Sequence, residues 1–80
     1  MIQDLVTSLR TLIHEQLFPL DDSVTESSDL HAAGLDSLAL MQLILLVENE
    51  YSVKITPDDL DRENFSSLKK LAEMIARKKI

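Results

Sequence analysis

Hydrophobic residues recur every three or four positions over three segments of the chain, which is the spacing of one face of an α-helix. The first segment covers residues 2–17, the second covers residues 38–50, and the third begins after Ser66 or Ser67. The pattern therefore predicts three main α-helices around one core. In the two outer helices the core positions are Ile2, Leu5, Val6, Leu9, Leu12 and Ile13, and Leu68, Leu71, Ala72, Ile75 and Ala76.

Turn-forming and capping residues separate these helices. Pro19 ends the first helix, and the polar stretch of residues 20–36 predicts a long structured loop. Val24 and Leu30 are the residues expected to hold this loop against the core. At its end, Asp36 stands where a short acid can accept the free N–H groups of the second helix.

A shorter connection follows the middle helix. Residues 53–55 indicate an extended link, and Thr56-Pro57-Asp58-Asp59 has the features of a helix start that continues for one or two turns to about Asp61. No strand ladder is indicated. We predict an all-α fold in a single domain over residues 1–80, a small four-helix bundle with three main helices, one short helix and a long first loop.

The middle helix is hydrophobic on more than one face. Its apolar side chains cannot all reach the same core, so a spare stripe remains for a partner or a ligand. These residues are Leu38, Leu40, Met41, Leu43, Ile44, Leu45, Leu46 and Val47.

Composition and charge narrow the function. The 80 residues include no Cys, which excludes a disulfide, a thiolate metal site and a nucleophilic thiol of the polypeptide itself. The net charge of −6 argues against nucleic acid as a partner, because binding phosphates requires basic residues. Residues 1–68 carry −10 and residues 69–80 carry +4. The acidic body either draws in basic partners or only maintains solubility, and composition leaves both open.

No targeting or membrane segment is indicated. The chain starts without a basic region, and its longest apolar run, residues 43–47, is far short of the ~20 residues that span a membrane. We therefore expect a cytoplasmic protein without membrane insertion.

The sequence gives little support to a catalytic site or a metal site. A serine hydrolase would need a histidine held against Ser37, and the only histidines are His14 and His31, with no sheet to support them. The acids of residues 59–63 alternate as at the start of a calcium loop, but the glycine and the bidentate glutamate of such a loop are missing. We predict no catalytic residue and no metal site.

Ser37 differs from the other serines. It follows Gly34, adjoins Asp36 and opens a helix whose first N–H groups and positive dipole end favour an anion, such as a phosphodiester on its hydroxyl. Alternatively, Asp36 or Ser37 is merely a helix cap, since both residue types commonly cap helices. The residues alone leave both interpretations open.

Three segments together carry a resemblance to a known family. Gly34-Leu35-Asp36-Ser37-Leu38 is followed by an apolar helix ending in Val47-Glu48-Asn49-Glu50-Tyr51 and then by Ile55-Thr56-Pro57-Asp58-Asp59. This combination resembles the carrier-protein family, which includes acyl carrier proteins and the thiolation modules of peptide and polyketide assembly. The likeness covers nearly the whole chain.

The resemblance implies a monomeric carrier without enzymatic activity. In it, Ser37 receives 4′-phosphopantetheine from coenzyme A, and the thiol of this covalent arm holds acyl or aminoacyl cargo as a thioester. Asp36 would orient the serine and assist metal-dependent attachment, Gly34 and Leu35 would shape the loop, and Leu38 would anchor the helix start. The implied partners are a phosphopantetheinyl transferase, a loading ligase or acyltransferase, and a downstream synthase or transferase.

The middle helix is the usual recognition element of the family, and here it departs from fatty-acid carriers. Those carriers place acids just after the serine, whereas Glu48 is the first acid downstream in this chain. We therefore expect partners to contact the apolar residues Leu40, Met41 and Ile44, with Asp36, Glu48 and the acids of the short helix on the rim. Met41 has ordinary core packing as its other interpretation.

Several alternatives stay open at this stage. Residues 60–68 resemble specialised carriers that a dedicated adenylating ligase charges, which favours a specialised acyl, polyketide, nonribosomal peptide or aminoacyl pathway over ordinary fatty-acid synthesis. The sequence does not decide whether hydrophobic cargo lies between the helices. The rival from another class is a non-catalytic interaction module in which Ser37 is only a cap.

Overall fold

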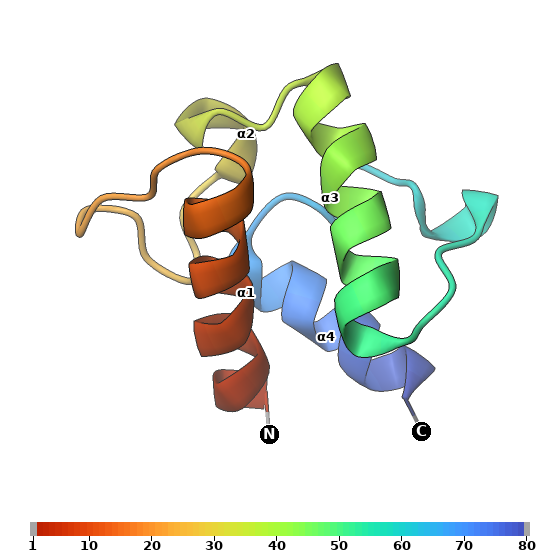
Figure 1. Ribbon diagram of the computed structural model, residues 1–80. Coiled ribbons are helices and arrows are strands. Elements are labelled where there is room, and N and C mark those ends of the chain that lie inside the picture. The colour runs from red at the N-terminus through yellow and green to blue at the C-terminus, as the bar shows by residue number, and fades with distance from the viewer. Residues whose placement is uncertain (1, 80) are drawn as a thin grey trace.

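Three long helices dominate the computed structural model, which describes residues 2–79. They are α1 (Ile2–Gln16), α3 (Ser37–Tyr51) and α4 (Leu68–Lys78), and two short segments accompany them, α2 (Leu30–Ala33) and the 3-10 turn η1 (Pro57–Asp59). Figure 1 shows α1 and α3 running in opposite directions, with α4 crossing at one end and η1 on the far side of α3 from α1. The predicted all-α bundle is confirmed, and residues 2–79 contain no strand.

One hydrophobic core joins the three long helices. Predicted core positions of α1 and α4 form much of it, whereas Ile2, Leu5, Leu12 and Ala76 are only half-buried. Burial of these apolar side chains is the main favourable contribution to folding. The buried core residues of the long helices are Val6, Leu9, Ile13, Leu43, Val47, Leu68, Leu71, Ala72, Met74 and Ile75, and Phe65 joins them from the preceding loop.

The long first loop contains one helical element that the sequence pattern does not reveal. Residues 30–33 form α2, which Asp29 caps by accepting a hydrogen bond from the His31 N–H (2.9 Å) and which ends at Gly34. Four residues are too few to show a helical period, so this segment is predicted as loop.

Two residues hold this loop in place, as predicted. Leu30 is fully buried, and its N–H donates to the carbonyl of Ser66 (2.8 Å). Val24 packs against the core, and its carbonyl accepts a hydrogen bond from the Arg10 guanidinium. The loop is therefore fixed both to the start of α4 and to α1.

The second connection contains less helix than predicted. η1 is a single 3-10 turn that ends at Asp59, whereas the sequence predicted a helix of one or two turns to about Asp61. Pro57 opens it, and the Asp59 carboxylate accepts hydrogen bonds from the Thr56 N–H (2.8 Å) and hydroxyl (2.9 Å). At the end of this connection Ser67, one of the two predicted caps, accepts from the Lys70 N–H (3.2 Å). None of the helices within residues 2–79 is long and apolar enough to cross a membrane.

Candidate functional site

Ser37 is the first residue of α3, and its side chain is exposed. The cap of this helix is Asp36, whose backbone is extended and whose Oδ1 accepts a hydrogen bond from the Ala39 N–H (2.9 Å). Among residues 2–79, the Ser37 hydroxyl has no hydrogen-bond partner. The capping role left open by the sequence therefore belongs to Asp36, and the serine hydroxyl faces solvent at the positive end of a fifteen-residue helix.

Gly34 makes the turn between α2 and this serine. Its φ of 138° lies in a region that L side chains rarely adopt, and an added Cβ would lie 3.2 Å from Cδ1 of Phe18. Its N–H donates to the carbonyl of Leu30 (3.1 Å), and the N–H of Leu35 donates to the same oxygen (3.0 Å). The direction in which the chain enters α3 thus depends on glycine at this position.

The structure corrects one expectation for this segment. Leu38 does not anchor the helix start, because its side chain is 67% exposed. Leu35 is 4% exposed and is part of the core, so it is the residue that fixes the loop before Asp36. The expectation came from the resemblance, which does not determine the direction that an apolar residue in the first turn of a helix faces.

Neither histidine contacts the serine through a hydrogen bond. His31 places its Nδ1 3.3 Å from the carbonyl of Leu35, and the His14 Nδ1 accepts a hydrogen bond from the Leu20 N–H (2.9 Å). Both rings therefore support the backbone of the long loop. The ring of His31 joins α2 to the residue that precedes the Asp36 cap.

The acids of residues 59–63 have separate partners. Asp59 pairs with Lys78, the Asp61 Oδ1 accepts from the Asn64 N–H (2.7 Å), and Glu63 lies 3.5 Å from the ammonium of Lys70. Within the described part of the chain, no group of three His, Cys, Asp or Glu side chains is arranged to hold a metal ion.

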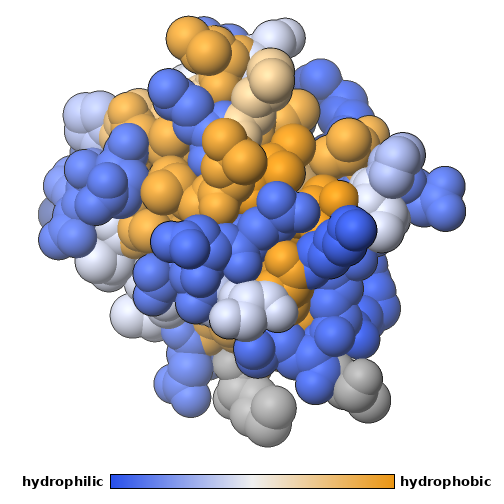
Figure 2. Space-filling model, turned by 45° about the vertical axis from the view of Figure 1, so that its right-hand side comes forward, coloured by the Kyte–Doolittle hydropathy of each residue, from blue (hydrophilic) through white to orange (hydrophobic). Residues whose placement is uncertain are grey.

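The spare hydrophobic stripe of α3 is real, although its members differ in part from the prediction. Met41 is exposed (65%), whereas Leu40 and Ile44 are half-buried against the core. Leu45 is exposed (67%), as is Leu38 beside the serine. Figure 2 shows apolar side chains gathered over the upper half of the visible face and polar ones over the lower half.

A second apolar feature lies between α1 and α3. An open groove of about 450 Å³ is lined by Leu17, Leu45 and Leu46, with amide side chains at its rim from Gln16, Gln42 and Asn49. Leu45 therefore borders both the groove and the exposed stripe. The predicted partner residues did not include this side of α3.

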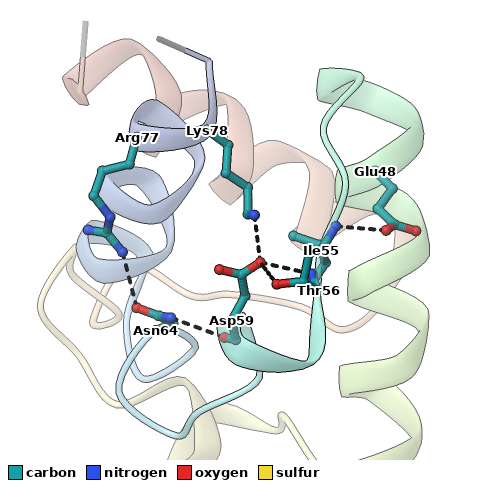
Figure 3. A network of polar contacts seen from close by, with 7 residues as sticks. All are labelled: Glu48, Ile55, Thr56, Asp59, Asn64, Arg77 and Lys78. Atoms are coloured by element: carbon teal, nitrogen blue, oxygen red, sulfur yellow. Dashed lines mark hydrogen bonds and ion pairs between the residues drawn. The ribbon is translucent and has the colours of Figure 1, made fainter.

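The other end of α3 is held by a network of polar contacts (Figure 3). The Glu48 Oε2 accepts a hydrogen bond from the Ile55 N–H (2.8 Å), and the Lys78 Nζ lies 2.5 Å from the Asp59 Oδ2. The side-chain amide of Asn64 donates to the Asp59 carbonyl (3.0 Å). The Lys78 ammonium and the hydrogen bonds from Thr56 hold the pKa of Asp59 at about 2, well below its usual 3.8.

The last residue of α3, Tyr51, is bonded to α1 and to a residue near the C-terminus. Its hydroxyl lies 2.6 Å from the Ser8 Oγ on α1, and its carbonyl accepts a hydrogen bond from the Lys79 ammonium (2.9 Å). Burial raises the pKa of this phenol above its ordinary value. The C-terminal end of α3 is therefore fastened to α1 and to the residue that follows α4.

Comparison with known families decides what kind of protein carries this serine. A family model described as "Phosphopantetheine attachment site" matches residues 7–75. The chain belongs to the phosphopantetheine-binding carrier proteins. The cofactor of this carrier is accordingly covalent 4′-phosphopantetheine, as the sequence motif predicted.

Curated relatives agree with this assignment. An aminoacyl carrier protein of Agrobacterium fabrum is 33% identical over 54 residues, which cover 68% of this carrier and 65%, just under two thirds, of the relative. An acyl carrier protein of Thermotoga maritima is 31% identical over 77 residues, covering 95% and 93% of the two chains. A D-alanyl carrier protein of Streptococcus uberis is 35% identical over 60 residues, covering 74% and 76%.

Solved structures show the same fold. A carrier protein from Agrobacterium tumefaciens, bound with ATP to an engineered glycine:[carrier protein] ligase of Bradyrhizobium japonicum, has a TM-score of 0.79 and 27% identity, covering 91% of this carrier and 97% of that chain. A glycylated carrier protein complexed with the Bradyrhizobium japonicum ligase has a TM-score of 0.70 and 26% identity, covering 91% and 96%. These neighbours confirm the predicted acyl-carrier-like bundle.

Proposed function

We propose that Ser37 is the residue that receives 4′-phosphopantetheine. The Ser37 Oγ would form a bond to the phosphorus of the pantetheine phosphate of coenzyme A, while the bond from that phosphorus to 3′,5′-ADP breaks and the hydroxyl proton passes to the transferase. The observation that supports this most strongly is the exposed hydroxyl of Ser37, which has no partner among residues 2–79. The N-terminus of α3 favours the negative charge of the resulting phosphodiester.

Two neighbours of the serine suit this role. Asp36 is exposed and precedes Ser37 in the chain, and only its Oδ1 serves as the helix cap. The carboxylate would therefore orient the serine and help hold a metal ion during attachment. Gly34 and the buried Leu35 fix the turn that presents the two residues. We assign the cofactor site to Ser37, Asp36 and Gly34, with Leu38 as an exposed flank.

The protein would act as a carrier, and the chemistry of transfer would lie with its partners. When bound, the arm supplies a terminal thiol that holds acyl or aminoacyl cargo as a thioester. The chain itself contributes the attachment point, and tethering keeps the cargo at a high effective concentration near each enzyme. The cytoplasmic location and the monomeric state expected from the sequence are part of this proposal.

Among the possible cargoes, we favour an aminoacyl group. Relatives named as aminoacyl and D-alanyl carrier proteins support this choice, as do structural neighbours solved with a glycine:[carrier protein] ligase. Loading by an adenylating ligase of this kind agrees with the resemblance of residues 60–68. An acyl carrier protein matches over more of the chain, so an ordinary acyl group is the second candidate cargo.

We further propose that the loading ligase binds the exposed stripe of α3. Leu38 and Met41 stand beside or close to Ser37, and Leu45 continues the same surface, so a ligase that reaches the arm would lie over them. Leu40 and Ile44, half-buried, form the floor of this surface. Because α3 has no acid in its first turn, the complementary ligase surface would be apolar more than basic.

The attachment is tested by intact-mass measurement after incubation with coenzyme A and a broad-specificity phosphopantetheinyl transferase. The natural chain and a Ser27→Ala variant should each gain one arm, because Ser27 is also exposed but lies in the long loop. A Ser37→Ala variant should gain none. Modification of the Ser37→Ala variant would refute the assignment of the site, and absence of any modification of the natural chain would favour the interaction module.

The docking surface needs a separate test. Met41→Glu replaces an exposed apolar side chain with a charge and should leave the fold intact while weakening loading by the cognate ligase. Gln42→Glu adds the same charge on a neighbouring exposed position and serves as the control. Equal loading of the Met41→Glu variant and the natural chain would remove the apolar stripe as the ligase contact.

A further inference from the structure

We call residues 52–60, which include η1, the strap. One face of α3 carries Ser37 near its start and contacts the strap near its end. Ser37, Met41, Ile44 and Glu48 follow one another at spacings of four, three and four residues and therefore share one face of the helix. Glu48 reaches from the end of this face to the backbone of the strap at Ile55. Cargo on an arm attached to Ser37 that entered the bundle along this face would meet the contact between α3 and the strap.

Polar contacts pin the strap at several points (Figure 3). Glu48 on α3 holds the Ile55 N–H, and Lys78 on α4 holds the Asp59 carboxylate. Asp59 in turn accepts two hydrogen bonds from Thr56. The strap is therefore fastened to α3 on one side and to α4 on the other.

The apolar side chains of the strap pack against the buried core. Val53 and Ile55 contact this core, whose fully buried members include Leu43, Val47, Phe65 and Met74. The half-buried residues of this layer are Ile44, Val53 and Ile55. Cargo that entered on this side would have to displace the strap and break its contacts. The gain from burial grows with each methylene, so it is smallest for short or polar cargo.

We infer that the pinned strap keeps the cargo outside the bundle, so that this carrier suits short or polar cargo such as an aminoacyl group. The inference rests on the proposed attachment at Ser37 and extends it to the class of cargo. Cargo held outside stays accessible to the enzyme that takes it up. Glu48, assigned from the sequence to the rim of the partner surface, is here a positioning residue that holds the strap.

The test compares a long and a short cargo on the same chain. A phosphopantetheinyl transferase loads the full chain from octanoyl-coenzyme A or acetyl-coenzyme A, and intact mass confirms the loading. The rate at which hydroxylamine cleaves each thioester is then divided by the rate for the same thioester on free pantetheine. We expect the two ratios to agree within about threefold, because exposed groups react without prior opening of the fold. Stronger protection of the octanoyl thioester would overturn the inference.

A matched set of variants shows whether the strap is responsible. Glu48→Gln keeps an oxygen that can accept from the Ile55 N–H and should behave like the natural chain. The double variant Glu48→Ala, Asp59→Ala removes both anchors, and its octanoyl thioester should become protected by more than about threefold. An unprotected octanoyl group in this variant, with its helical circular dichroism retained, would show that the strap is not what excludes cargo.

A second readout keeps the inference testable if the double variant unfolds. In the natural chain, octanoyl loading should change amide chemical shifts near Ser37 and leave those of Val47 and Phe65 as in the acetyl form. Shifts at these two buried residues would overturn the inference. If no arm is attached at Ser37, the proposed function fails and the inference falls with it. If the arm is attached at Ser37 and the octanoyl thioester is protected, the inference fails while the proposed function stands.

Discussion

The two ends of α3 are built in opposite ways. At the N-terminal end, the Asp36 carboxylate caps the helix while the Ser37 hydroxyl beside it is exposed and has no partner among residues 2–79. At the C-terminal end, Tyr51 is bonded to both Ser8 and Lys79, and Glu48 holds the backbone of Ile55. One end can be reached by another protein, and the other end is hydrogen-bonded to α1, to the strap and to Lys79.

The basic side chains of residues 77–79 make their contacts away from the serine end of α3. The sequence shows only that residues 69–80 carry a charge of +4. In the structure, Arg77, Lys78 and Lys79 each bond a different segment, namely Asn64, Asp59 and the carbonyl of Tyr51. Lys78 therefore fastens the strap, Lys79 fastens the end of α3 and Arg77 contacts the loop before α4, and none of these three bonds involves the serine end.

The largest predicted effect contrasts two leucines at the serine end. Leu35→Ala should lower the free energy of unfolding by about 2–5 kcal/mol, because it leaves a cavity in the core. Leu38→Ala should change it by less than about 0.5 kcal/mol, because that side chain is exposed. Urea denaturation followed by circular dichroism measures both. Equal losses would show that Leu38 anchors the helix after all.

Gly34→Ala should have the next largest effect. The positive φ and the approach of the new Cβ to Phe18 together should reduce the free energy of unfolding by about 1–3 kcal/mol. Ala32→Gly, a change at a nearby exposed position in α2, provides a control for general loop sensitivity. A Gly34→Ala variant as stable as the natural chain would mean that this turn does not require glycine.

The cap of α3 should matter somewhat less. Asp36→Ala removes the acceptor for the Ala39 N–H and should lower the free energy of unfolding by about 0.5–2 kcal/mol. Asp36→Asn retains a capping oxygen and should lose much less, although it removes the charge beside Ser37. These two variants separate the effect on stability from the effect on attachment. If the carboxylate orients the serine, the transferase should modify both of them more slowly. Unchanged modification rates would leave Asp36 a cap alone.

The smallest effect concerns pH and the strap. The pKa of Asp59 is about 2 in the folded chain against 3.8 ordinarily, so the stability it contributes is present above about pH 4 and is lost as the pH falls toward 2. Because the pair is partly accessible to solvent, we expect at most about 1 kcal/mol. Asp59→Asn should flatten this part of the stability profile, as measured by urea midpoints from pH 5 to pH 2. A variant whose midpoints fall as steeply as those of the natural chain would contradict the assignment.

Much of the fold could be predicted because helical spacing and caps act locally. The periods of α1 and α4, the Asp36 cap and the Thr56-Pro57 start all follow from neighbouring residues. The sequence missed α2 because four residues show no period, and it could not say which face of α3 the core takes. The exposure of Leu38 and the half-burial of Leu40 and Ile44 differ from expectation for that reason, since burial in α3 depends on how α1 and the strap lie against it.

Some residues around the site could likewise be predicted from the sequence, and others could not. Gly34, Asp36 and Ser37 could be found from their order in the motif, because a turn, a cap and a hydroxyl follow one another along the chain. The network of Glu48, Asp59 and Lys78 could not, since it joins three segments that only the fold brings together. The sequence pattern around residues 48, 59 and 78 does not indicate which side chains become partners.

The central claim is that the open end of α3 takes the arm on one particular oxygen. Fragmentation mass spectrometry of the chain, after reaction with coenzyme A and the transferase, locates the added group directly. We predict a single 4′-phosphopantetheine on the peptide that contains Ser37 and on the fragment ions that include this residue. The same group found on any other serine or threonine, with Ser37 unmodified, would contradict the account.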